Sequence, residues 1–160
     1  MMKKRLLLLI IVLLSFININ AQNDKPEINI GANLGVVTNS DSQIVLGLDG
    51  ELFYVVDANF KVGVATGLIF TTKNNGVLLP LAASGRFKAN NKFGLGLDVG
   101  YALPINNSSG SLYVRPMLEY DLANNSKLKF SYSGLNKRGY LNVGILFRLN
   151  PRKRSITVSF

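Results

Sequence analysis

The stretch KFGLGLDVGYALPI, residues 92–105, alternates between large apolar positions and small or polar ones. Its odd positions carry the bulky side chains of Phe93, Leu95, Leu97, Val99, Tyr101 and Leu103. The even positions between them carry Gly94, Gly96, Asp98, Gly100 and Ala102. Because successive side chains of a β-strand point to opposite faces, this period of two predicts a strand with one apolar face and one nearly bare face.

The same period of two continues through most of the chain after Gln22 and predicts eight strands without a convincing helix. We expect the strands at residues 27–37, 43–55, 59–71, 77–88, 92–104, 111–121, 127–134 and 139–149. The connections after the second, fourth and sixth strands are compact turns rich in Asn and Asp, at residues 57–59, 89–91 and 123–126. The other connections are slightly longer and richer in Gly and Ser. This alternation predicts an up-and-down antiparallel meander in one domain.

The charged residues of the expected strands all lie on the face opposite the apolar one. That second face consists mainly of Gly, Ala, Ser and Asn, with a few charges of both signs, and is too sparse for a water-facing surface. It suits the interior of a narrow barrel, because about eight strands leave room only for side chains. The pattern therefore predicts an all-β fold, a closed antiparallel transmembrane β-barrel of eight strands with its apolar face in lipid.

The expected interior contains charges of both signs that can neutralise one another. We predict a structural lumen network of Asp49, Glu51, Arg86, Asp98, Arg115, Glu119 and Lys129. A catalytic carboxylate pair is the alternative use of the four acidic residues, and the network is favoured. Aromatic residues are expected to form a girdle near the short-turn end, namely Tyr54, Phe60, Phe87, Phe93, Tyr120 and Phe147.

The composition excludes several kinds of chemistry, since the chain contains no cysteine and no histidine. Thiolate nucleophiles, disulfides, zinc sites of the usual kind, imidazole bases and a lipoprotein anchor are all excluded. We therefore expect no enzymatic activity, no metal site and no cofactor.

The N-terminus has the pattern of a secretory signal peptide, expected at residues 1–21 with cleavage before Gln22. Three cationic residues at positions 3–5 precede the apolar run at residues 6–14; a membrane-spanning anchor would need a longer run. Removal of those three charges lowers the net charge of +9 to about +6. For an exported basic protein, phosphate-bearing lipid is a better expected partner than nucleic acid. The barrel domain is expected at residues 22–150, followed by a basic tail at residues 151–160.

The segment GVLLPLAASGRFKANNKFGLGLDVGYAL, residues 76–103, resembles small outer-membrane β-barrels of the OmpX and OmpA-transmembrane-domain type. The segment NVGILFRL is similar to the signal that the barrel-assembly machinery reads on a closing strand, with Asn142, Gly144, Phe147 and Leu149 in the matching positions. The resemblance implies a monomer in the outer membrane of a Gram-negative bacterium. It also implies outer-membrane lipids, lipopolysaccharide and, during biogenesis, the assembly machinery as partners.

Two features depart from that family. Pro116 lies within the sixth expected strand, where a closed barrel has no free edge, so we predict a β-bulge there. The chain also continues past the eighth strand to Phe160. Residues 151–160 are expected to lie in the periplasm as a basic tail; the alternative places residues 155–160 in the wall as the closing strand.

Two classes of function are compatible with these patterns. The first is an integral outer-membrane protein with a structural or interaction role and a plugged lumen. The alternatives are a soluble exported carrier with a lipocalin-like interior for a small hydrophobic ligand, and a narrow-pore channel.

Overall fold

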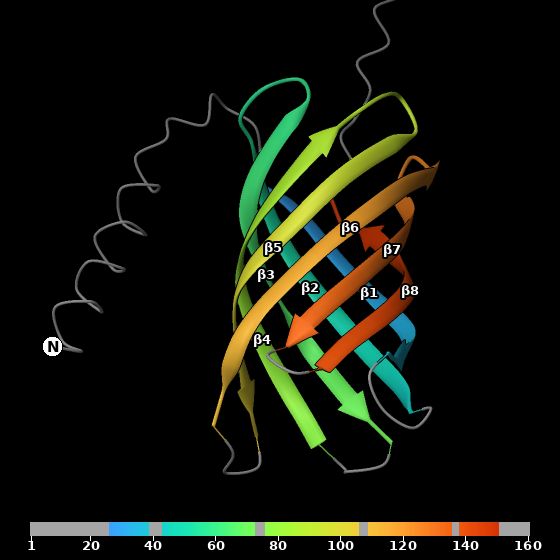
Figure 1. Cartoon of the computed structure of the whole chain (residues 1–160). Helices are drawn as coiled ribbons and strands as arrows, with labels where there is room; N and C mark the ends of the chain where they lie inside the picture. Colours follow the sequence, from blue (N-terminus) through green and yellow to red (C-terminus); the bar gives the residue numbers. More distant parts are fainter. Residues whose placement is uncertain (1–25, 39–42, 73–75, 106–108, 136–137, 151–160) are drawn as a thin grey trace, which may run out of the picture.

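A computed structural model describes residues 26–38, 43–72, 76–105, 109–135 and 138–150. It contains eight strands: β1 Glu27–Val37, β2 Ile44–Val55, β3 Phe60–Thr71, β4 Gly76–Lys88, β5 Phe93–Pro104, β6 Ser111–Ala123, β7 Ser126–Leu135 and β8 Arg138–Arg148. Each strand pairs with its sequence neighbours and β8 closes on β1, all antiparallel (Figure 1). The predicted eight-stranded up-and-down barrel is confirmed, and each strand end lies within two residues of its expected position.

The described part of the chain contains no helix that is long and apolar enough to cross a membrane. The expected signal peptide at residues 1–21 and the expected tail at residues 151–160 lie outside the described residues.

The strand register determines how steeply the strands are tilted. A path that starts at Glu27 on β1 and steps from each residue to its paired partner on the next strand goes once around the barrel. It returns to β1 at Val37, ten residues further along the chain. It passes through Phe53, Gly63, Ser84, Asp98, Arg115, Ser133 and Tyr140, with Arg115 set opposite Ser133 by the flanking β6–β7 pairs. With about 3.3 Å per residue and about 4.8 Å between strands, this displacement corresponds to a tilt of about 40°. Twelve-residue strands then span about 30 Å.

The two faces of the wall have opposite polarity. The large exposed hydrophobic side chains of β5 are Phe93, Leu95, Leu97, Val99, Tyr101 and Leu103. Between them, Asp98 and Ala102 point inward and are completely buried. The same alternation holds for the other strands: the charged side chains that the structure describes are buried in the lumen or lie at its short-turn mouth. The apolar face is therefore the outside of this barrel.

Compact turns join the strands at one end, called here the short-turn end, which lies at the top of Figure 1. Asp57 accepts hydrogen bonds from the backbone N–H groups of Asn59 and Phe60, at 2.6 and 2.9 Å. Asn90 accepts equivalent bonds from Lys92 and Phe93, both at 2.8 Å. These are the turns that the Asn and Asp residues predicted, since a short polar side chain caps the backbone two and three residues on.

The prediction of a β-bulge at Pro116 is wrong. Val114 pairs with Gly134 and Met117 with Ser131, so the β6–β7 register is the same on both sides of the proline. Proline lacks an N–H and interrupts the ladder there without adding a residue to the strand. The irregularity in this pair of strands lies between Asp121 and Ala123, near the short-turn end.

The seam between β1 and β8 extends past the last residue of β8. Leu149 donates its N–H to the carbonyl of Ile28 at 2.9 Å, and the side-chain oxygen of Asn150 accepts from the N–H of Ile28 at 2.9 Å. The side-chain NH₂ of Asn150 also donates to the carbonyl of Pro26. An amide side chain thus continues the ladder just before Pro151. The strand that closes the barrel on β1 is therefore β8, while residues 155–160, the alternative closing strand, lie outside the described residues.

Candidate functional site

Arg86 on β4 crosses the lumen and binds carboxylates from three other strands. Its guanidinium donates to Glu51 on β2 at 3.0 Å, to Asp98 on β5 at 2.7 Å and to Glu119 on β6 at 2.8 Å. The guanidinium also lies over the ring of Phe53, 4.8 Å from the ring centroid. A planar group with five donors suits this position, because each edge can face a different acceptor. One side chain therefore links four strands through the interior.

Arg115 on β6 and Lys129 on β7 extend these contacts. Arg115 donates to Asp49 at 2.6 Å and to Asp98 at 2.7 Å. Lys129 donates to Asp49 at 2.6 Å and lies 3.4 Å from Glu51. The structure thus places all seven residues assigned to the lumen in one continuous network, and each is at most 8% exposed: Asp49, Glu51, Arg86, Asp98, Arg115, Glu119 and Lys129.

An eighth member of this network, Lys127, is not among the residues predicted from the sequence. Its ammonium lies 2.6 Å from the carboxylate of Glu119 and is 20% exposed near the short-turn mouth of the lumen. With Lys127 included, four carboxylates face four cationic groups, so their formal charges cancel. We call these eight residues the lumen network. Balance of this kind is required in a confined interior, since an unpaired buried charge is strongly destabilising.

A second, smaller group of charges at the short-turn mouth was also missed. Glu27 on β1 binds Lys61 on β3 at 2.6 Å and Arg148 on β8 at 3.0 Å. The inward register of these positions is visible in the sequence. Their pairing is not, because Glu27 reaches Lys61 across β2 and meets Arg148 only once β8 has closed the barrel onto β1.

Glycines make room for the lumen network. A Cβ atom on Gly96 would lie 2.7 Å from both Arg86 Cδ and Met117 Cγ. A Cβ atom on Gly144 would lie 2.7 Å from the Cβ of Asn33, whose amide donates to Asp49 at 2.8 Å. The bare face of these strands is therefore the space into which long charged side chains of other strands extend.

An apolar layer fills the lumen at the long-loop end. It consists of Val37, Val45, Ala82, Ala102, Tyr113, Leu135 and Tyr140, with Ile69 and Leu78 packed against it. Tyr113 and Tyr140 are 1% and 2% exposed, so these two rings occupy the cross-section almost without solvent contact. The lumen is therefore filled by an apolar layer toward one end and by ion pairs in its middle.

The lumen network is arranged for charge balance. Asp98 accepts hydrogen bonds from Arg86, Arg115 and Ser84, and the Ser84 hydroxyl also accepts from Arg86 at 2.6 Å. A hydroxyl held in this way is fixed between a carboxylate and a guanidinium. Among the described residues, no group of three or more acidic side chains is placed to hold a metal ion.

The four residues that match an assembly signal lie on both faces of β8, with Leu149 just past its last residue. Asn142 and Gly144 face the lumen, where the Asn142 amide lies 3.4 Å from the Ser133 hydroxyl. Phe147 and Leu149 face outward and are 49% and 56% exposed. Recognition of this segment during assembly stays a prediction.

The fold is similar to that of solved transmembrane barrels. A de novo designed transmembrane β-barrel matches with a TM-score of 0.60 at 16% identity, over 79% of this chain and 98% of that chain. The crystal structure of Ail, the attachment invasion locus protein of Yersinia pestis, matches with a TM-score of 0.52 at 16% identity, over 78% and 97%. The N-terminal β-barrel domain of OprF from Pseudomonas aeruginosa matches with a TM-score of 0.50 at 16% identity, over 78% and 100%.

No family model and no curated protein matches the chain. At sequence identities of 16%, the structural similarity shows a shared fold. The chain has the fold of the small eight-stranded outer-membrane β-barrels.

Replacement of Arg86 by Gln tests the importance of charge balance in the lumen. Arg86→Gln removes the cation that Glu51, Asp98 and Glu119 share, and breaking such a buried set costs about 3–5 kcal/mol. Lys88→Gln is the matched control, since Lys88 points the same way on the same strand but is exposed at the rim; its expected cost is within about 0.5 kcal/mol. Urea unfolding of the refolded protein in lipid vesicles measures both values. Equal costs for the two variants would show that the network does not stabilise the barrel.

Proposed function

We propose that this chain is an integral outer-membrane β-barrel with a closed lumen and a structural or interaction role. The observation that carries the proposal is the segregation of polarity across the wall. The outward side chains form a nearly continuous apolar surface, while the ion pairs lie inside or at the short-turn mouth. Such an apolar surface is suited to contact with hydrocarbon. In addition, the closed barrel leaves no unpaired strand edge that faces the lipid.

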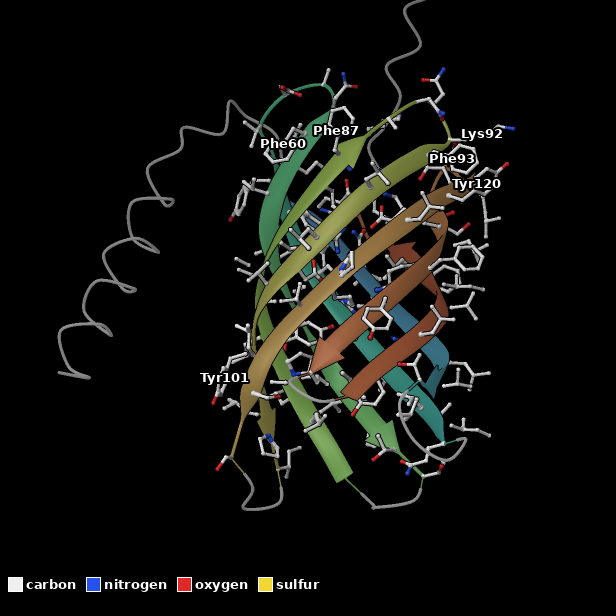
Figure 2. The ribbon with its side chains drawn as sticks, viewed as in Figure 1. Phe60, Phe87, Lys92, Phe93, Tyr101 and Tyr120 are labelled. Carbon is white, nitrogen blue, oxygen red and sulfur yellow. The ribbon has the colours of Figure 1, made fainter. Side chains whose placement is uncertain are left out.

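The outward aromatic residues support placement in a bilayer. At the short-turn end, Phe60 pairs with Phe87 across β3 and β4, and the rings of Phe93 and Tyr120 lie 4.9 Å apart. Figure 2 shows these four side chains near one rim and Tyr101 toward the other end. Phe93 and Tyr101 are eight residues apart on a strand tilted by about 40°, which separates them by about 20 Å along the barrel axis. That distance is close to the apolar band of about 25 Å in outer-membrane barrels.

Exposed basic residues at the short-turn end support lipid headgroups as partners. Lys88 and Lys92 lie at this rim beside the aromatic girdle. In the proposed orientation the short-turn end faces the periplasm, as in the family that the sequence resembles. Each basic residue near an anionic membrane surface adds about 1 kcal/mol of attraction. Lipopolysaccharide on the outer leaflet and the assembly machinery during biogenesis are part of the same proposal.

The filled lumen favours this function over the two alternatives. A lipocalin-like carrier needs an apolar cavity for its ligand, whereas the middle of this interior is occupied by ion pairs. A channel needs a continuous water path, whereas the apolar layer and the lumen network lie in series along the axis. We propose no catalytic role.

A lysine on the outer wall tests the placement in lipid. Leu97 lies near the middle of β5 and is 48% exposed, so Leu97→Lys is expected to cost about 2–4 kcal/mol and to prevent stable insertion. Leu122→Lys places the same charge near the short-turn rim, where the expected cost is about 0–1 kcal/mol. Insertion is measured as the heat-modifiable gel shift after refolding into vesicles, and as retention in carbonate-washed membranes. Two variants that both insert normally, or a wild-type protein that washes off the membrane, would contradict the proposal.

Electrical recordings test the closed lumen. The purified barrel reconstituted into planar bilayers is expected to give no steady porin-like conductance, because eight strands enclose only enough space for their own side chains. Empty bilayers provide the baseline, and brief flickering events are compatible with a closed barrel. A stable open channel of large conductance would refute the proposal of a plugged lumen.

A further inference from the structure

On the outer wall, the described residues of β2, β3 and β4 form a shallow groove. It has a volume of about 380 Å³ and is lined by Leu48, Asp49, Gly50, Thr66, Gly67, Leu68 and Leu79. Gly50 and Thr66 are paired partners at the middle of β2 and β3. A Cβ atom added to Gly50 would meet only the methyl group of Thr66, at 3.7 Å, so the space above this glycine is open. The groove therefore exists because a glycine replaces a large side chain on the outward face.

The groove lies over a break in the wall. The β3–β4 ladder pairs Thr66 with Leu81 and Ile69 with Leu78, but it is interrupted at the residues between these pairs. Pro80 lies in this interval and has no N–H to donate. The Thr66 hydroxyl donates to the Pro80 carbonyl at 3.0 Å, which satisfies a backbone acceptor at the break. The ladder is thus less complete here than elsewhere in this pair of strands, and the open space above it is mainly apolar.

The chemistry of the groove is suited to a hydrocarbon chain. Leucine side chains form its margins, and the carboxylate of Asp49 is turned into the lumen, where it binds Arg115 and Lys129. No charged group is thus directed toward an occupant. The groove also lies at mid-strand, within the proposed apolar band of the wall, where lipid tails would be the surrounding medium.

From these observations we propose that the groove over Gly50 and Thr66 is a binding site for one lipid acyl chain. This inference rests on the proposed membrane function. A second copy of the chain fits the geometry less well, because seven lining residues are far fewer than the 20–30 or so per side of a stable protein interface. A flexible acyl chain can follow a local, irregular depression and cover the interrupted ladder.

Photo-crosslinking in nanodiscs tests the site. The full-length barrel is reconstituted with a phospholipid that carries a diazirine along one acyl chain, and adducts are mapped by mass spectrometry of peptides. Labelling is expected to be several-fold enriched on the peptides that contain Leu48, Thr66 and Leu79 relative to outward residues of β7. Gly50→Leu fills the groove and is expected to abolish the enrichment. Gly134→Leu is the matched control, since Gly134 also faces outward, on the opposite side of the barrel, and its labelling pattern is expected to remain that of the wild type.

Each other outcome has a distinct meaning. Even labelling of all outward residues would overturn the acyl-chain site and leave the proposed membrane function intact. The absence of labelling from the whole outer wall would contradict the proposed function itself. In a parallel sample treated with a bifunctional amine-reactive crosslinker, a crosslinked pair of barrels that Gly50→Leu eliminates would assign the groove to a second copy of the chain and overturn the proposal.

Discussion

The desolvation of charge inside a narrow closed wall is the constraint on which the rest of this structure depends. Four carboxylates and four cationic groups are held within the lumen of an eight-stranded barrel. Their mutual contacts must compensate for the water they lose, and the arginines do so by facing several carboxylates at once. The wall must leave space for these long side chains, which explains the glycines on its inner face. Apart from the apolar layer at the long-loop end, most of the large apolar side chains then lie on the outside.

Much of the fold was predictable because a period of two needs no knowledge of tertiary contacts. In β5 the alternation from Phe93 to Leu103 determines which side chains share a face, and the sparse polarity of the other face determines which one is the interior. The turns at Asp57 and Asn90 were likewise predictable, since each side chain accepts hydrogen bonds from backbone N–H groups only two and three residues further along the chain. The proline in β6 misled the prediction. The missing N–H of Pro116 suggests a bulge, whereas the structure keeps the β6–β7 register and leaves the ladder interrupted at the proline.

The candidate site was predictable in its membership but less so in its connections. Mid-strand charges such as Asp98 and Arg115 could be assigned to the lumen from register alone. The register also turns Lys127 and Glu27 inward, but side chains near strand ends extend either to solvent or back to a partner in the lumen, so their ion pairs could not be predicted. The contact of Glu27 with Arg148 depends in addition on closure between the first and last strands. The groove at Gly50 combines contributions from three strands and gives no local signal in the sequence.

The most direct test of the inverted polarity is a depth profile of the outer wall. The chain has no cysteine, so a single Cys at Phe93, Leu95, Leu97, Val99, Tyr101 or Leu103 gives one spin-label site without further changes. Collision rates of the label with oxygen and with a water-soluble nickel chelate are measured after reconstitution into vesicles. If this face lies in lipid, the collision rate with oxygen is highest for labels at Leu97 and Val99 and falls toward both rims. The collision rate with the nickel chelate is lowest at the same two positions and rises toward both rims. High nickel access at Leu97 and Val99, equal to that at the rims, would show that this apolar face does not lie in lipid.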